Sequence, residues 1–137
     1  MSDEPVDERV ILAERLYEAF DADDAATLRE LLHPRFVGEV TPGLPRDWGG
    51  TYEGPETMLR ECWARVFAEL DARPVPEELI ATGDGRLLVV GSYRGRARAS
   101  GRLLDARFAH LLSFADGRIA RLVQITDSAR WHEALAG

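Results

Sequence analysis

Lysine and asparagine are both missing from the 137-residue sequence, and all 17 basic residues are arginines. Without lysine, no side-chain amine can form a Schiff base, so that class of covalent catalysis is excluded. The 24 acidic residues outnumber the arginines and give a net charge of -7 at pH 7. Because this balance repels a phosphate backbone, we expect no nucleic-acid partner and turn to small molecules and proteins.

Cysteine and long apolar runs are also scarce. The single Cys62 cannot form an internal disulfide and lies in an apolar helical pattern, where a free cysteine usually behaves as a small buried hydrophobe. The acidic stretch 1–5 is not followed by a pure apolar segment, so no signal peptide is predicted. No run approaches the roughly 18 apolar residues that a membrane span needs. We therefore expect one cytoplasmic domain over residues 1–137 that binds no membrane.

The first half of the chain has the period of amphipathic helices. Apolar residues recur at spacings of three and four over residues 10–20, 28–32 and 55–70, which predicts three helices. Between the second and third of these, residues 37–40 predict a short strand, and the segment 41–50, rich in proline and glycine, predicts a long loop.

In the second half the period changes to two. Segments near 77–82, 86–99, 103–114 and 118–127 alternate like strands and are separated by glycine-containing turns. Helices followed by antiparallel strands predict an α+β fold, with the helices gathered on one face of a curved sheet. Because the strands are apolar on both faces, a second subunit is the simplest cover for the other face, and we expect a homodimer.

Common metal and nucleotide motifs do not occur. The three histidines, His33, His110 and His132, have no ligand spacing with one another or with Cys62. There is no P-loop, and the glycines within residues 93–99 lie in a strand pattern rather than at a helix start. We therefore expect neither a metal site nor an organic cofactor.

Two polar residues stand out on apolar strand faces. His110 lies mid-strand between Phe108 and Leu112, where an imidazole either is a hydrogen-bonded core group or lines a pocket. Asp127 ends the last strand on the parity of Ile125, and its carboxylate either caps the terminal helix or faces a pocket. Burial among apolar neighbours would raise the pKa of such a carboxylate. The pattern leaves both alternatives open for each residue.

The short strand and the long loop supply further candidates. Glu39 falls in the short strand, and Trp48 and Tyr52 flank the glycine pair of the loop. Aromatic residues in such a loop either form the wall of a cleft or fill the core. Arg94, Arg96 and Arg98 share one strand face, where they either bind a phosphate or carboxylate, or form a solvated edge or a row of ion pairs between subunits.

Several short strings occur in an order that is typical of a known family. They are Leu16-Tyr17-Glu18-Ala19-Phe20 before an Asp-rich turn, Leu31-Leu32-His33-Pro34, Pro42-Gly43-Leu44-Pro45, Phe108-Ala109-His110, and Gln124-Ile125-Thr126-Asp127. In these strings the chain resembles, over nearly its whole length, the SnoaL-like branch of the NTF2-like superfamily, together with ketosteroid isomerases, polyketide cyclases and limonene epoxide hydrolases. The resemblance implies a cone in which three N-terminal helices and a curved, mostly antiparallel sheet enclose an apolar pocket.

The same resemblance implies a function. It points to a small-molecule enzyme, an isomerase, cyclase or aldol lyase, with cofactor-independent acid–base chemistry on an apolar substrate that carries a carbonyl group. Asp127 would be the general base, and His110 its acid or orienting partner. The other side chains expected to line the pocket are Glu39, Trp48, Tyr52, Trp63 and Tyr93.

Two departures from the family pattern keep alternatives open. Val40 stands where the ketosteroid isomerases carry their base, and Asp127 lacks the Arg-x-Asp partner of the epoxide hydrolases. One alternative is a non-catalytic ligand-binding or dimeric association domain. The other is an epoxide hydrolase of the limonene epoxide hydrolase kind.

Overall fold

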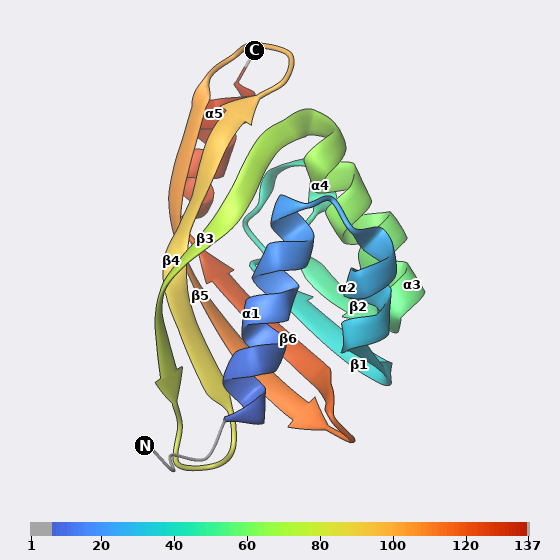
Figure 1. The fold of residues 1–137 in the computed structure, drawn as a ribbon. Helices are drawn as coiled ribbons and strands as arrows, with labels where there is room; N and C mark the ends of the chain where they lie inside the picture. The colour runs from blue at the N-terminus through green and yellow to red at the C-terminus, as the bar shows by residue number, and fades with distance from the viewer. Residues whose placement is uncertain (1–6, 137) are drawn as a thin grey trace.

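The computed structural model describes residues 7–136, and Figure 1 shows helices packed against one side of a strongly bent sheet. Two helices come first, α1 (Glu8–Asp21) and α2 (Ala25–Leu31). The carboxylate of Asp24 caps α2 by accepting a hydrogen bond of 3.0 Å from the backbone N–H of Thr27. An N-cap of this kind pairs an N–H group that the start of a helix leaves free. The interruption between the two apolar stripes is therefore a capped turn.

The third helix changes its winding along its length. It runs through α3 (Pro55–Thr57), the π-helical segment η2 (Met58–Trp63) and α4 (Ala64–Glu69). π-Helical turns are rare and are frequent at functional sites. With α5 (Ser128–Leu135) at the other end of the chain, the residues that the structure describes form four helices rather than the three expected.

Six strands form one mixed sheet in the order β2-β1-β6-β5-β4-β3. Every neighbouring pair is antiparallel except β1 and β6, which run parallel. The α+β class is therefore confirmed, with a mixed sheet. The strands are β1 (Leu32–Val40), β2 (Gly50–Glu53), β3 (Leu70–Ala81), β4 (Leu87–Ala97), β5 (Leu103–Ala115) and β6 (Arg118–Thr126).

Two strands begin earlier than the sequence pattern predicts. β1 starts at Leu32, directly after α2, and β3 starts at Leu70, directly after α4. β3 passes through Pro74 and Pro76, and its pairing with β4 shifts register just after Pro76. Prolines lack the N–H that a central strand must donate, but β3 is the last strand of the sheet and pairs on one side only. A proline-containing segment can therefore be a strand here.

The core lies between the helices and the concave face of the sheet. Side chains of β5 alternate, so that Phe108, His110 and Leu112 are buried while the residues between them are more exposed. Helix α5 lies along β5 and β4 (Figure 1), and its Trp131 is buried in the same core. Within residues 7–136, no helix has both the length and the apolar character that crossing a bilayer requires.

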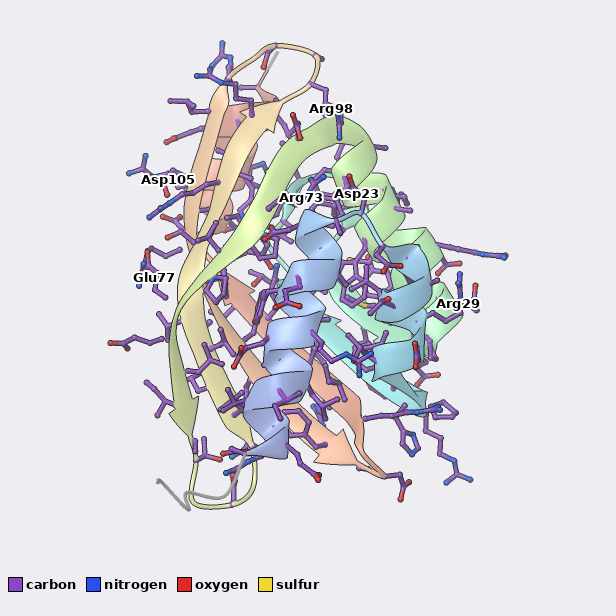
Figure 2. The ribbon with its side chains drawn as sticks, in the orientation of Figure 1. Asp23, Arg29, Arg73, Glu77, Arg98 and Asp105 are labelled. Atoms are coloured by element: carbon purple, nitrogen blue, oxygen red, sulfur yellow. The ribbon has the colours of Figure 1, made fainter. Side chains whose placement is uncertain are left out.

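The outer face of the sheet combines ion pairs with exposed apolar side chains. Glu77 pairs with Arg94, at 3.2 Å, and with Arg107, and Figure 2 shows Glu77 on the outer side of the sheet. The exposed apolar side chains include Leu103, which is 66% exposed, and Ile125, which is 63% exposed. Of the three arginines within residues 94–98, Arg94 thus forms exposed ion pairs, whereas Arg96 and Arg98 donate to the backbone carbonyl oxygens of Gly101 and Phe67.

Candidate functional site

An internal cavity of about 30 Å³ lies between α1, the third helix, α5 and the concave face of the sheet. Its wall is mostly apolar, and its polar groups include the side chains of Tyr93, His110 and Gln124. The structure thus brings three of the candidates, Trp63, Tyr93 and His110, into one lining. A space of this size holds only about two water molecules.

His110 is hydrogen-bonded through both ring nitrogens. In β5 it lies opposite Val89 of β4 and Gln124 of β6, with its side chain only 3% exposed. Its Nδ1 is 2.8 Å from the hydroxyl oxygen of Tyr17, and its Nε2 is 2.7 Å from the hydroxyl oxygen of Tyr93. The imidazole is thereby fixed between a helix and a neighbouring strand. Both predicted roles of His110 apply, because it is a core group with both nitrogens hydrogen-bonded and it also lines a cavity.

The site is uncharged around neutral pH. Burial lowers the pKa of His110 from its ordinary value of 6.5 to about 3, because a desolvated imidazolium is unfavourable. Burial also raises the pKa of Tyr17 and of Tyr93, so both hydroxyls keep their protons. Among the described residues that line the cavity, none is an aspartate or a glutamate. The chemistry available here is hydrogen-bond donation by neutral groups.

A count of protons shows what the trio of Tyr17, His110 and Tyr93 can donate. A neutral imidazole carries one N–H, and each tyrosine carries one O–H, which makes three protons for the two hydrogen bonds within the trio. If Nδ1 carries the ring proton, the spare hydroxyl proton belongs to Tyr17. If Nε2 carries it, the spare proton belongs to Tyr93, which lines the cavity. The second tautomer therefore supplies a donor to a molecule inside.

Gln124 extends this network. Its amide nitrogen donates to the Tyr93 hydroxyl oxygen at 3.2 Å, and its amide oxygen accepts from the backbone N–H of Thr41 at 3.2 Å. Gln124 and Tyr17 were not among the candidates from sequence. Strand parity could have indicated Gln124, because it shares the inward face of β6 with Leu122.

Asp127 lies outside the cavity lining. Its side chain is 48% exposed at the N-cap position just before α5, forms no capping hydrogen bond, and lies 3.9 Å from Arg130. Thr126 occupies the inward position, where its hydroxyl donates to the Arg107 carbonyl oxygen and accepts from the indole N–H of Trp131. Strand alternation then turns the next residue outward. The expectation of a buried Asp127 carboxylate facing the pocket is corrected accordingly.

Three further candidates also lie away from the cavity. Glu39 forms an ion pair with Arg121 and is partly exposed. Trp48 is fully buried in the core, and the Tyr52 hydroxyl donates to the Trp48 carbonyl oxygen at 2.6 Å. Burial raises the pKa of Tyr52 to about 12. The loop aromatics therefore fill the core rather than line the cavity.

Known proteins resemble this chain in sequence and in fold. The family model of the SnoaL-like domain matches residues 13–122. An uncharacterized protein of Mycobacterium tuberculosis is 32% identical over 113 residues, which cover 81% of this chain and 82% of that protein. The structure is similar to an NTF2-like protein of unknown function from Burkholderia pseudomallei, with a TM-score of 0.87, 25% identity and coverage of 96% and 100%.

A second similar structure is of a protein that was co-crystallized with a small molecule. It is that of TerC, co-crystallized with polyporic acid, with a TM-score of 0.83, 25% identity and coverage of 93% of this chain and 98% of that chain. The family match extends from α1 to β6 and so includes the elements that carry Tyr17, Tyr93 and His110. The chain therefore belongs to the SnoaL-like family and has the NTF2-like fold.

Proposed function

We propose that the protein is a small-molecule enzyme that performs cofactor-independent acid–base chemistry on an apolar substrate carrying a carbonyl group, as an isomerase, cyclase or aldol lyase. The observation that carries the proposal is His110, held between the hydroxyls of Tyr17 and Tyr93 at the wall of an apolar cavity. Hydrogen bonds to a developing negative charge are strong in such a water-poor, preorganised site. The trio thus suits a reaction in which an oxygen gains charge.

The reactions named above share one intermediate. When hydroxide from the solvent takes a proton from the carbon beside a carbonyl group and becomes water, negative charge collects on the carbonyl oxygen as an enolate. Tyr93 donates its hydroxyl hydrogen bond to that oxygen. The N–H groups of His110 and Gln124 in turn donate to the Tyr93 oxygen, which favours donation by stabilising the charge that this oxygen gains.

His110 acts in this proposal as a positioning residue. With its pKa near 3, the imidazole is neutral around pH 7 and is a weak proton acceptor. Two roles were expected for His110, acid or orienting partner, and the neutral imidazole favours the orienting role. Asp127 has no part in the proposal, because its exposed carboxylate does not line the cavity.

Proton exchange on a simple ketone tests the chemistry. 2-Tetralone is an apolar bicyclic ketone, and the exchange of its α-protons in D₂O can be followed by NMR with and without protein. We expect acceleration by the unmodified protein and a loss of about a hundredfold of that acceleration in Tyr93→Phe, as for the removal of one oxyanion donor. Asp127→Asn is the matched control and should keep the rate. A large loss in Asp127→Asn with none in Tyr93→Phe would restore Asp127 as the base.

A second candidate function is ligand binding without catalysis. It is favoured by the completeness of the network, since no buried side-chain nitrogen or oxygen among the described residues lacks a hydrogen-bond partner. The test is to measure the binding of 2-naphthol, which resembles the enol of 2-tetralone, and of polyporic acid, the compound crystallized with TerC. Binding of either compound without any acceleration of α-proton exchange would favour this candidate over the enzyme.

A further inference from the structure

Three aromatic side chains separate the cavity from a larger pocket. Phe20, Trp63 and Phe67 line both spaces. The ring centroids of Phe20 and Trp63 are 4.9 Å apart in an edge-on contact, and those of Phe20 and Phe67 are 5.8 Å apart. The second space, here called the outer pocket, has a volume of about 270 Å³, is more open to solvent, and lies between the α1–α2 turn and the third helix. The three rings are thus a shared wall.

One ion pair stands beside this wall. Arg73, at the start of β3, places its guanidinium 5.5 Å from the centroid of the Phe67 ring. The same guanidinium donates two hydrogen bonds, of 2.7 and 2.8 Å, to the carboxylate of Asp23 in the α1–α2 turn (Figure 2). Asp23 itself lines the outer pocket. Arg73 therefore ties the turn to β3 while it covers the outermost ring.

The helix that carries two of the rings is irregular where they lie. Trp63 is the last residue of the π-helical segment η2, and Phe67 follows one turn later in α4. Cys62, beside Trp63, lines the inner cavity and is buried. π-Helical turns are rare in proteins and are frequent at functional sites, and this one carries a ring of the shared wall.

We propose that Phe20, Trp63 and Phe67 form a gate between the outer pocket and the cavity, and that the Asp23–Arg73 pair holds this gate closed over Phe67. The inference rests on the proposed function in taking Tyr93 and His110 as the groups that bind the ligand. A cavity of about 30 Å³ is too small for a molecule with two rings, whereas the two spaces joined would accept one.

The gate also defines the class of ligand. The ligand's oxygen accepts a hydrogen bond from Tyr93, and the rest of the ligand passes between the displaced rings into the outer pocket, whose wall includes Leu28 and Leu59. The ligand is therefore an elongated apolar molecule with a carbonyl or hydroxyl oxygen at the buried end. A compact polar molecule would not displace three aromatic rings.

The single cysteine reports on the gate without any substrate. Cys62 lies on the inner side, so its reaction with the uncharged aromatic disulfide 4,4′-dithiodipyridine measures how often the cavity opens. Asp23→Asn keeps a residue that tolerates the positive φ of 53° at this position but weakens the pair with Arg73. We expect it to raise the labelling rate about two- to fivefold, the effect of losing an exposed ion pair. Phe67→Ala should raise it roughly tenfold or more, because it removes part of the wall.

The matched control is Glu69→Gln, which breaks the 3.1 Å pair between Arg46 and Glu69 at the end of α4, because neither residue lines the cavity or the outer pocket. Its labelling rate should equal that of the unmodified protein. Urea separates gate opening from global unfolding, since opening exposes little surface and the labelling rate should then depend only weakly on urea.

Two results would overturn the gate. One is a urea dependence of labelling as steep as that of global unfolding in every variant. The other is a rate in Asp23→Asn and Phe67→Ala no higher than in Glu69→Gln. Because the labelling needs neither ligand nor turnover, its outcome is independent of 2-tetralone exchange in Tyr93→Phe, and either idea can fail without the other.

Discussion

At the scale of single residues, the site depends on a histidine that is kept uncharged. Burial costs the imidazolium its solvation, and the two tyrosine hydroxyls stabilise the neutral ring by bonding to both nitrogens. The unfolded chain exposes His110 to water, where its pKa is close to 6.5. Between pH 6.5 and 3 the unfolded state thus binds a proton at this residue that the folded state does not.

This difference predicts a loss of stability in acid. Protonation of His110 in the unfolded state lowers the free energy of unfolding by about 1.4 kcal/mol for each pH unit below roughly 6, down to near pH 3. Above pH 6.5, His110 is neutral in both states and causes no loss in the free energy of unfolding. His110→Gln cannot titrate, so its free energy of unfolding should fall less steeply between pH 7 and 4. Urea unfolding of both proteins across this range is the measurement, and equal pH slopes would contradict the buried neutral histidine.

At the scale of elements, the bend of the sheet requires β3 and β4 to lie very close together. A side chain at Gly91 of β4 would collide with the carbonyl oxygen of Val75 and would lie 2.9 Å from the Phe108 ring. The proline-containing stretch of β3 runs past this point, next to the register shift after Pro76. Gly91 therefore lets the edge strand follow the curve that encloses the cavity.

A single methyl group should disturb this bend. We expect Gly91→Ala to lower the free energy of unfolding by about 1–3 kcal/mol, the usual cost of overpacking. Gly83→Ala, in the β3–β4 turn, is the control, because a methyl group there meets no atom within 4 Å. Thermal or urea unfolding of the two variants gives the comparison. If the two substitutions had the same effect, close packing at Gly91 would not be the reason for the glycine.

The sequence pattern predicted the elements to different degrees. The stripes of α1 and the third helix and the alternation of β4, β5 and β6 were clear because each buries one face in a regular period. β3 was predicted only from residue 77, since Pro74 and Pro76 oppose a strand unless it lies at an edge. An edge position is a property of the sheet order, which no local window contains.

At the scale of the whole molecule, the outer face of the sheet keeps large apolar side chains exposed beside its ion pairs. Three large apolar side chains are exposed on this face or at its ends: Ile80, Leu103 and Ile125. Because burying such side chains stabilises proteins, a partner that covers them would be favourable. The helices cover the concave face only (Figure 1). We propose, as the sequence pattern already predicted, that a second copy of the chain covers the outer face in a homodimer.

Light scattering after size exclusion tests the dimer. The unmodified protein should have twice the mass of one 15.3 kDa chain at micromolar concentration. Ile125→Asp places a charge on the outer face of β6 and should yield the monomer, because a buried unpaired charge is costly. Ile11→Asp, on the exposed side of α1, is the matched control and should stay dimeric. A monomer mass for the unmodified protein would contradict the proposal.

The sequence alone determined the lack of a lysine for a Schiff base, the α+β class and the resemblance to the SnoaL-like family, because composition, periodicity and turn residues are local properties of a chain. It also placed His110 and Tyr93 on inward faces. Only the tertiary structure decided which groups bond to the two ring nitrogens of His110: the hydroxyl of Tyr17, which is 93 residues away in the sequence, and that of Tyr93, which is 17 residues away. It also decided that Asp127 faces solvent. The physical reason is that such contacts depend on strand register and helix packing, which join residues that no sequence window holds together.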